Sequence, residues 1–171
     1  KSLCYQLPAL LGEGIAIVVS PLIALMEDQL AGLKKRGVKA MGIYGPLSQN
    51  ELVRRLDNAD FGTYKLLYLS PERLRQELVL ERLSRLEVSL IAIDEAHCIS
   101  QWGFDFRPAY LECHRLRDLH PDTPVIALTA TAPPRVLEDI QRLLEIPEAR
   151  LFKDSVKREN IAYRILQTED K

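Results

Sequence analysis

Five short, nearly continuous apolar runs constrain the fold of this chain more than any other feature of its sequence. They are residues Ile15–Val19, Ala40–Tyr44, Leu66–Leu69, Leu90–Ile93 and Val125–Leu128. Such strands are typical of a parallel sheet that helices cover on both faces, because neither side of the strand meets water. The segments between the runs are amphipathic and long enough to be crossover helices. We therefore predict an α/β domain with a mainly parallel, doubly wound sheet.

The connecting segments carry signals for helix starts. Ser48 opens a capping-box pattern, SQNE. Serine–proline pairs at residues 20–21 and 70–71 each place a capping residue before a proline, which predicts that a helix begins there. An apolar stripe over residues 136–144 follows the prolines at 133–134 and predicts another helix. Ligands of such sheets bind beyond the carboxyl ends of the strands, so residues that follow the apolar runs are the candidates for a site.

Composition excludes several classes of protein. The length of 171 residues fits one domain with a sizeable core. The net charge of 23 − 24 = −1 excludes a polybasic tail or a DNA-coating protein and still allows a local basic groove. The shares of hydrophobic residues, 47%, and charged residues, 27%, argue against wholesale disorder. No apolar run approaches the roughly 18 residues that span a bilayer, and no signal-peptide pattern is present, so we expect no membrane partner.

The cysteines and the first residue bear on location and completeness. Cys4, Cys98 and Cys113 are odd in number, far apart and without a Cys-x-x-Cys pair, so we expect neither a zinc site nor a disulfide framework. This usage favours a reducing, intracellular compartment. Because the chain opens on Lys1 and a helix-like pattern, we interpret it as a piece of a longer chain.

Two segments far apart in the sequence suggest a nucleotide site. Asp94 and Glu95 follow an apolar run. The first could hold hydrated Mg²⁺, and the second could orient or deprotonate a water that attacks a γ-phosphate. For the acidic pair taken alone, a solvated acidic turn is the simpler interpretation. Lys1 and Ser2 match the last two residues of a phosphate loop, in which the lysine reaches the β/γ-phosphates and the hydroxyl binds Mg²⁺. Together the two segments form one hypothesis.

Two further segments leave alternatives open. Residues 129–131, Thr-Ala-Thr, could bridge a nucleotide site to another ligand, or could serve as a turn and helix cap. Residues 101–108, which we call the aromatic loop, hold the single Trp and two of the four Phe. Exposed aromatic rings could stack on nucleic-acid bases and Arg107 could contact phosphate. The same rings could instead pin the loop to its own domain.

In chain order these residues resemble the first motor domain of a RecQ-type DNA helicase of superfamily two. The similar segments are residues 1–10 (tail of the phosphate loop), 20–29 (motif Ia), 67–74, 94–108 (motif II with an aromatic-rich loop), 127–132 (motif III) and 158–161. The stretch 94–108 is the most specific of them, because a string that long is unlikely to match by chance. Asp-Glu-Ala-His alone is shared with many RNA helicases. The resemblance implies a RecA-like three-layer fold over residues 1–161, with 162–171 beginning the connection to a second motor domain.

The resemblance also implies roles for individual residues, with ATP and Mg²⁺ as cofactors. Lys1 would bind the β/γ-phosphates, Ser2 and Asp94 would bind Mg²⁺, and Glu95 would be the catalytic base. The residues that would couple the nucleotide to DNA are His97, Gln101, Thr129 and Thr131, of which His97 and the two threonines would lie at the nucleotide. The residues that would contact DNA are Ser20, Pro21, Gln101, Trp102, Phe104, Phe106 and Arg107.

The parent protein would then be an ATP-dependent 3′–5′ DNA helicase of replication, recombination and repair, found in the cytoplasm at the nucleoid if bacterial. Its partners would be single-stranded and partly duplex DNA and its own second motor domain. Phe104 departs from the His usual in the family, and Ala109 from a frequent Glu. The glycines of the phosphate loop and the second domain's arginine finger lie outside these residues, so we expect the isolated chain to be nearly inactive. A non-catalytic nucleic-acid-binding remnant and a nucleotide-dependent switch are the alternatives.

Overall fold

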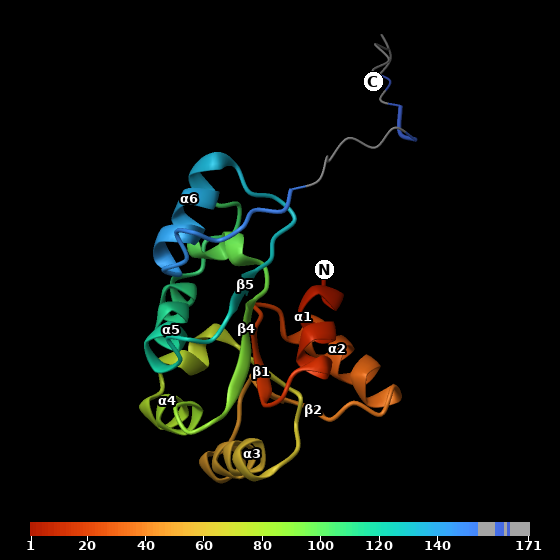
Figure 1. The fold of residues 1–171 in the computed structure, drawn as a ribbon, viewed down its shortest axis with the longest axis vertical. Coiled ribbons are helices and arrows are strands. Elements are labelled where there is room, and N and C mark those ends of the chain that lie inside the picture. The colour runs from red at the N-terminus through yellow and green to blue at the C-terminus, as the bar shows by residue number, and fades with distance from the viewer. Residues whose placement is uncertain (154–159, 163, 165–171) are drawn as a thin grey trace, which may run out of the picture.

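A parallel five-stranded sheet forms the centre of the chain in the computed structural model, which describes residues 1–153, 160–162 and 164 (Figure 1). Its strands are β1 (Ile15–Val19), β2 (Ala40–Ile43), β3 (Leu66–Leu69), β4 (Val88–Ile93) and β5 (Val125–Ala127). Their order across the sheet is β2-β3-β1-β4-β5, and every neighbouring pair is parallel. The predicted α/β class and all five predicted strands are confirmed, although β4 begins earlier than its apolar run.

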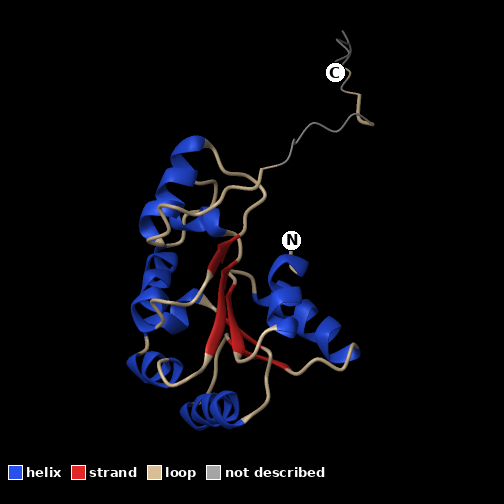
Figure 2. Cartoon of the chain, viewed as in Figure 1, coloured by secondary structure: helices blue, strands red, loops and turns tan. Residues whose placement is uncertain are grey.

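Helices cover both faces of this sheet (Figure 2). The α-helices are α1 (Leu3–Leu11), α2 (Ile23–Lys35), α3 (Gln49–Phe61), α4 (Glu77–Leu83), α5 (His114–Leu119) and α6 (Pro134–Leu143). Short 3₁₀ helices, η1 (Pro71–Arg75), η2 (Ala96–Ile99) and η3 (Pro108–Cys113), lie between them. Helices α1 and α2 pack on one face and α3 to α6 on the other, which makes three layers.

The central strand shows why the apolar runs identified the sheet. Ile17 and Val19 belong to the core under α3 to α6, whereas Ala16 and Val18 belong to the core under α1 and α2. All residues of β1 are buried. A strand packed on both faces needs an apolar residue at every position, and this is the pattern in the sequence.

The predicted helix starts have mixed outcomes. Ser48 caps α3 as predicted, because its hydroxyl accepts a hydrogen bond from Glu51 N at 3.2 Å. The pair at 70–71 starts the short η1. The start predicted at 20–21 is wrong, since α2 begins at Ile23. Ser20 N donates to Leu69 O at 3.1 Å, so the strand pairing runs on through Ser20 and delays the helix.

The register brings three strand ends together at one edge of the sheet. Val19 of β1 pairs with Ile93 of β4, and Ile93 pairs with Ala127 of β5. The residues that follow these strands therefore emerge side by side. They are the ones that the sequence singled out: the pair at 20–21, the acidic pair at 94–95 and the threonines at 129 and 131. None of the helices in the described ranges is long and apolar enough to cross a membrane.

Candidate active site

The two neighbouring carboxylates end up in different surroundings. Asp94 extends the sheet by donating its N–H to Val19 O at 2.9 Å, and it is only 6% exposed. Glu95 then adopts a left-handed conformation, with φ of 47°, which turns the chain out of the strand. Because this conformation is costly for a residue with a Cβ, it persists only where the surroundings fix it. Ala96 N fixes it from one side by donating to Leu128 O at 2.9 Å.

Tyr110 of η3 holds the backbone of the acidic pair in place. Its hydroxyl donates to the Asp94 backbone O at 2.8 Å, and its side chain is fully buried. Nothing in the sequence around Tyr110 indicated this role. Burial raises the pKa of the Asp94 carboxyl, and the charge of Glu95 adds to the effect, while the Glu95 N–H and the charge of Lys1 act against it. A bound cation would shift the balance toward the charged carboxylate.

Lys1 meets the acidic pair, as the paired hypothesis requires. Helix α1 packs against β1 and β4, and Lys1 at its amino end places Nζ 2.7 Å from Glu95 Oε1. The Ser2 hydroxyl, at the N-cap of α1, makes no capping hydrogen bond and so is not committed to the helix. The Ser2 hydroxyl and the Asp94 carboxylate supply hard oxygen ligands of the kind that Mg²⁺ prefers. The residues present therefore fit a magnesium-bound polyphosphate.

His97 connects the acidic pair to the end of β5. Its Nδ1 lies 3.0 Å from Thr129 Oγ1 and 3.4 Å from Glu95 Oε2. Thr129 also closes a turn, since its hydroxyl donates to Thr131 O at 3.0 Å and accepts from Thr131 N at 3.3 Å. The turn predicted for this segment is confirmed. The helix-cap role is wrong, because Pro133 is the N-cap of α6.

The aromatic loop begins directly after η2. Trp102 is 67% exposed and Phe104 is fully exposed, whereas Phe106 is half-buried. The first two rings are therefore not plugs for the domain's own core. Arg107 secures the end of the loop by donating from Nη1 to Pro21 O at 2.9 Å and by pairing with Asp105 at 3.0 Å. This contact joins the loop to the segment after β1.

Other predicted site residues are placed as follows. Ser20 is buried, and its hydroxyl has no hydrogen-bond partner among the described residues. Pro21 is half-buried, and Gln101 is exposed beside Trp102. Of the segment 158–161, residues 158 and 159 lie outside the described part of the chain, as do most of residues 162–171. The domain boundary placed there therefore stays a prediction.

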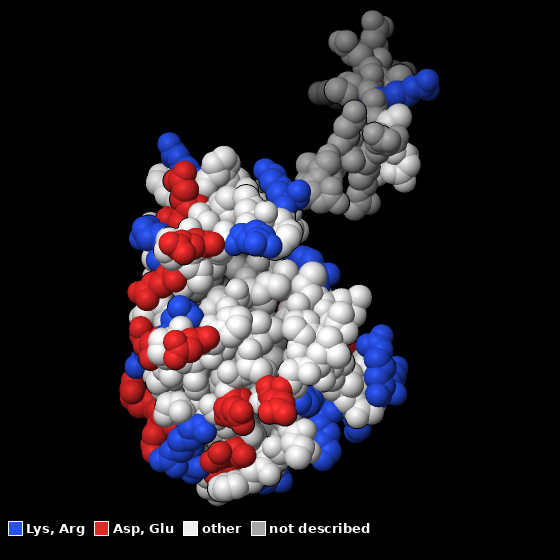
Figure 3. Space-filling view, in the orientation of Figure 1, with Lys and Arg blue, Asp and Glu red and all other residues white. Residues whose placement is uncertain are grey.

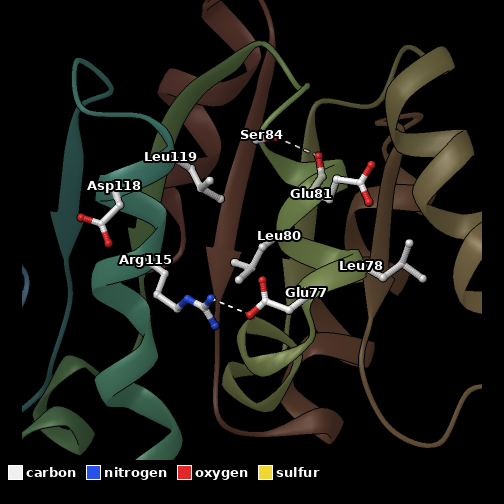
Figure 4. A pocket seen from close by; sticks show the side chains of 8 residues that line it. All are labelled: Glu77, Leu78, Leu80, Glu81, Ser84, Arg115, Asp118 and Leu119. Carbon is white, nitrogen blue, oxygen red and sulfur yellow. Dashed lines mark hydrogen bonds and ion pairs between the residues drawn. The ribbon is translucent and has the colours of Figure 1, made fainter.

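The surface near the site carries no dominant charge on the face that Figure 3 presents. Acidic and basic side chains alternate along α4 to α6, and a wide uncharged area lies between them and α1. A cavity of 670 Å³ lies elsewhere, between α4 and α5, where Arg115 donates to Glu77 at 2.8 Å (Figure 4). None of the predicted site residues lines it.

Gly103 limits the shape of the aromatic loop. A Cβ at this position would lie 2.4 Å from His97 O and 3.0 Å from Ser100 O, both backbone atoms. We expect Gly103→Ala to lower the free energy of unfolding by about 1–3 kcal/mol through this overlap, measured by urea denaturation. Gly32→Ala is the matched control: its Cβ would meet only the end of Arg36 at 3.7 Å, and alanine should stabilise α2 by up to about 1 kcal/mol. Equal effects of the two substitutions would contradict the overlap.

Comparisons with known proteins agree with this geometry. The family model described as DEAD/DEAH box helicase matches residues 1–140. The chain is 45% identical over its whole length to the ATP-dependent DNA helicase RecQ of Bacillus subtilis, of which it covers 29%. It is 47% identical over 99% of its length to the probable ATP-dependent DNA helicase RecS of the same organism, of which it covers 34%. The chain thus spans about a third of these relatives.

Solved structures give the same fold. The Pyrococcus furiosus Hef helicase domain superimposes with a TM-score of 0.62 at 20% identity, over 85% of this chain and 30% of that one. The C-terminal domain of the DEAD-box protein Dbp5 gives 0.56 at 16% identity, over 83% and 78%. These likenesses confirm the RecA-like three-layer fold. The chain belongs to the DEAD/DEAH box helicase family and, by its identity to the curated relatives, to the RecQ-type branch of it.

Proposed function

We propose that this chain is the first motor domain of an ATP-dependent DNA helicase that moves 3′ to 5′ along single-stranded DNA. One observation carries the proposal. A lysine, an acidic pair, a histidine and a threonine from three separate segments form one contact chain, and an exposed aromatic loop begins a few residues beyond it. The names of the curated relatives, ATP-dependent DNA helicases, support it.

The residues divide the chemistry among them. Lys1 would neutralise the β/γ-phosphates, while Ser2 and Asp94 would hold Mg²⁺, which draws charge from the phosphate oxygens. Glu95, half-exposed where Asp94 is buried, would accept the proton of the attacking water. Lys1 must first leave Glu95 for the phosphates, and this exchange frees the base only when nucleotide is bound. The pair at 2.7 Å would therefore hold both side chains at the site until the nucleotide binds.

DNA would meet the domain at the aromatic loop. Trp102 and Phe104 are exposed and can stack on bases of any sequence. Phe104, in place of the family's His, keeps the stacking surface and lacks a titratable nitrogen. With a net charge of −1, DNA contact would be local, and the isolated domain would bind weakly and with strong dependence on salt.

The proposal is tested by strand separation with the full-length protein that contains this sequence. Duplexes with a 3′ or a 5′ single-stranded tail are mixed with protein, ATP and Mg²⁺, and release of the labelled strand is followed. We expect release from the 3′-tailed duplex alone, and about a tenfold higher half-saturating DNA concentration for Trp102→Ala. Phe61→Ala is the control. Phe61 is also exposed, and it ends α3, which leads to the amino end of β3, whereas the site lies at the carboxyl ends of the strands.

Release from the 5′-tailed duplex alone would contradict the polarity. No release from either duplex, combined with DNA binding that ATP does not alter, would support the non-catalytic remnant instead. Equal effects of Trp102→Ala and Phe61→Ala would remove the aromatic loop from the DNA interface.

A further inference from the structure

Helix α6 contacts the aromatic loop at two places around Trp102. Asp139 Oδ2 accepts a hydrogen bond from the Ser100 hydroxyl at 2.7 Å, and the same Ser100 oxygen accepts from Trp102 N at 3.1 Å. One turn earlier on the same helix face, the Arg135 guanidinium lies over the Trp102 ring, 5.3 Å from its centroid. Backbone and ring of Trp102 are therefore both held from α6.

The hydrogen bond from Ser100 to Asp139 joins a buried serine to a charged carboxylate. Ser100 is fully buried, so its hydroxyl has to find its partners within the protein. Hydrogen bonds from Ser100 and Arg142 hold the pKa of Asp139 below its usual range, so this carboxylate is charged at neutral pH. Hydrogen bonds to a charged acceptor are about twice as strong as neutral ones. Arg142 approaches the other oxygen, Oδ1, at 2.6 Å and leaves the contact with Ser100 undisturbed.

Helix α6 is also tied to the nucleotide side of the site. It starts at Pro134, three positions after Thr131, and its N-cap is Pro133. Two consecutive prolines restrict the backbone of this connection. Thr131 is hydrogen-bonded to Thr129, which lies against His97. A displacement at His97 and Thr129 would therefore move the start of α6, and with it Asp139.

We propose that Asp139 is a positioning residue which, through the Ser100 hydroxyl, couples the nucleotide site to the placement of Trp102. Asp139 lies outside the contact chain of the nucleotide site, and its carboxylate accepts hydrogen bonds from Ser100 and Arg142. It sets where the aromatic loop begins relative to α6, so it determines how much DNA is needed to accelerate hydrolysis. This inference rests on the proposed function and adds to it a residue outside the segments that resemble helicase motifs.

The test measures ATP hydrolysis by the full-length protein while single-stranded DNA is titrated. For Asp139→Ala we expect the half-saturating DNA concentration to rise about tenfold, as loss of a charge-assisted hydrogen bond predicts. The rate without DNA should stay within about twofold, because Asp139 lies outside the contact chain of Lys1, Glu95 and His97. Asp139→Asn keeps an oxygen acceptor for Ser100 and should restore most of the coupling.

Two further variants separate this link from general stability. Ser100→Ala should reproduce the effect of Asp139→Ala, and the double variant should be no worse than either, because both changes break the same hydrogen bond. Arg142→Gln is the matched control, since it removes the other partner of Asp139 and leaves the Ser100 contact; it should behave as wild type. Ser100→Ala also keeps the inference testable if Asp139→Ala fails to fold.

The outcomes separate the role of Asp139 from the proposed function of the whole site. If the wild type is stimulated by DNA and the Asp139 and Ser100 variants respond to DNA as it does, the inference is overturned and the proposed function stands. Additive effects in the double variant, or an effect of Arg142→Gln equal to that of Asp139→Ala, would also overturn it. If DNA does not stimulate the wild type at all, the proposed function fails, and the inference falls with it.

Discussion

ATP hydrolysis by the full-length protein is expected to fall by about 10²–10⁴-fold when Glu95 is changed to Gln, the range that a general base contributes. The amide is almost the same size as the carboxylate and cannot take up the proton of the attacking water. The affinity for ATP should be unchanged or higher, because the glutamate that competes for Lys1 at 2.7 Å has lost its charge. Single-turnover hydrolysis and equilibrium binding of a fluorescent ATP analogue measure the two quantities separately.

Glu148→Gln is the matched control for this prediction. Glu148 is exposed, and the same change of charge there should leave both hydrolysis and binding at the wild-type level. If Glu95→Gln retained more than about a tenth of the wild-type rate, Glu95 would not be the base. If it lost ATP binding instead of turnover, the carboxylate would serve the structure of the site rather than its chemistry.

Lys1→Ala is expected to weaken ATP binding, which Glu95→Gln leaves intact. Removing one partner of a charge pair that forms with the phosphates should weaken ATP binding about thirtyfold or more. Hydrolysis at saturating ATP should fall as well, since the charge that develops on the γ-phosphate would lose the positive charge that Lys1 supplies. Lys34→Ala, which removes an exposed lysine from the last turn of α2, should change neither.

The two variants therefore give different patterns: Glu95→Gln loses turnover and keeps ATP binding, whereas Lys1→Ala loses both ATP binding and turnover. The ion pair between Lys1 and Glu95 makes this contrast informative, because both residues contact each other in the nucleotide-free structure. Unchanged ATP affinity in Lys1→Ala would mean that Lys1 serves only to hold Glu95, and that the phosphates are bound elsewhere.

The sequence predicted the sheet well because β1 and β3, which lie inside it, are buried along their whole length and carry an apolar or aromatic residue at every position. The one helix start that was predicted wrongly has a different cause, a backbone contact between residues far apart in the chain. Serine is a favoured residue at a helix N-cap, and a proline follows it at position 21. The backbone of Ser20 nevertheless pairs with Leu69, a residue far along the chain. The residues next to Ser20 in the sequence do not indicate this distant partner. The strand pairing therefore overrides the preference of serine for a helix N-cap.

The site was predictable in part for the same reason. Carboxyl ends of parallel strands share one edge, so Asp94 and Thr129 could be placed together before the structure was known. The supporting residues could not. Tyr110 contributes through a backbone oxygen, and the partners Ser100 and Asp139 are 39 positions apart. Neither contact has a spacing or a residue pattern that sets it apart from an ordinary core tyrosine or an ordinary helix-face aspartate.

The central claim is that the contact chain from Lys1 to Thr129 and the aromatic loop form one DNA-dependent ATPase. The most direct test is the rate of ATP hydrolysis by the full-length protein with and without single-stranded DNA. We expect hydrolysis that DNA accelerates and that Glu95→Gln abolishes in both conditions. Hydrolysis at the same rate with and without DNA would contradict the coupling, and no hydrolysis in either condition would contradict the assignment of the site itself.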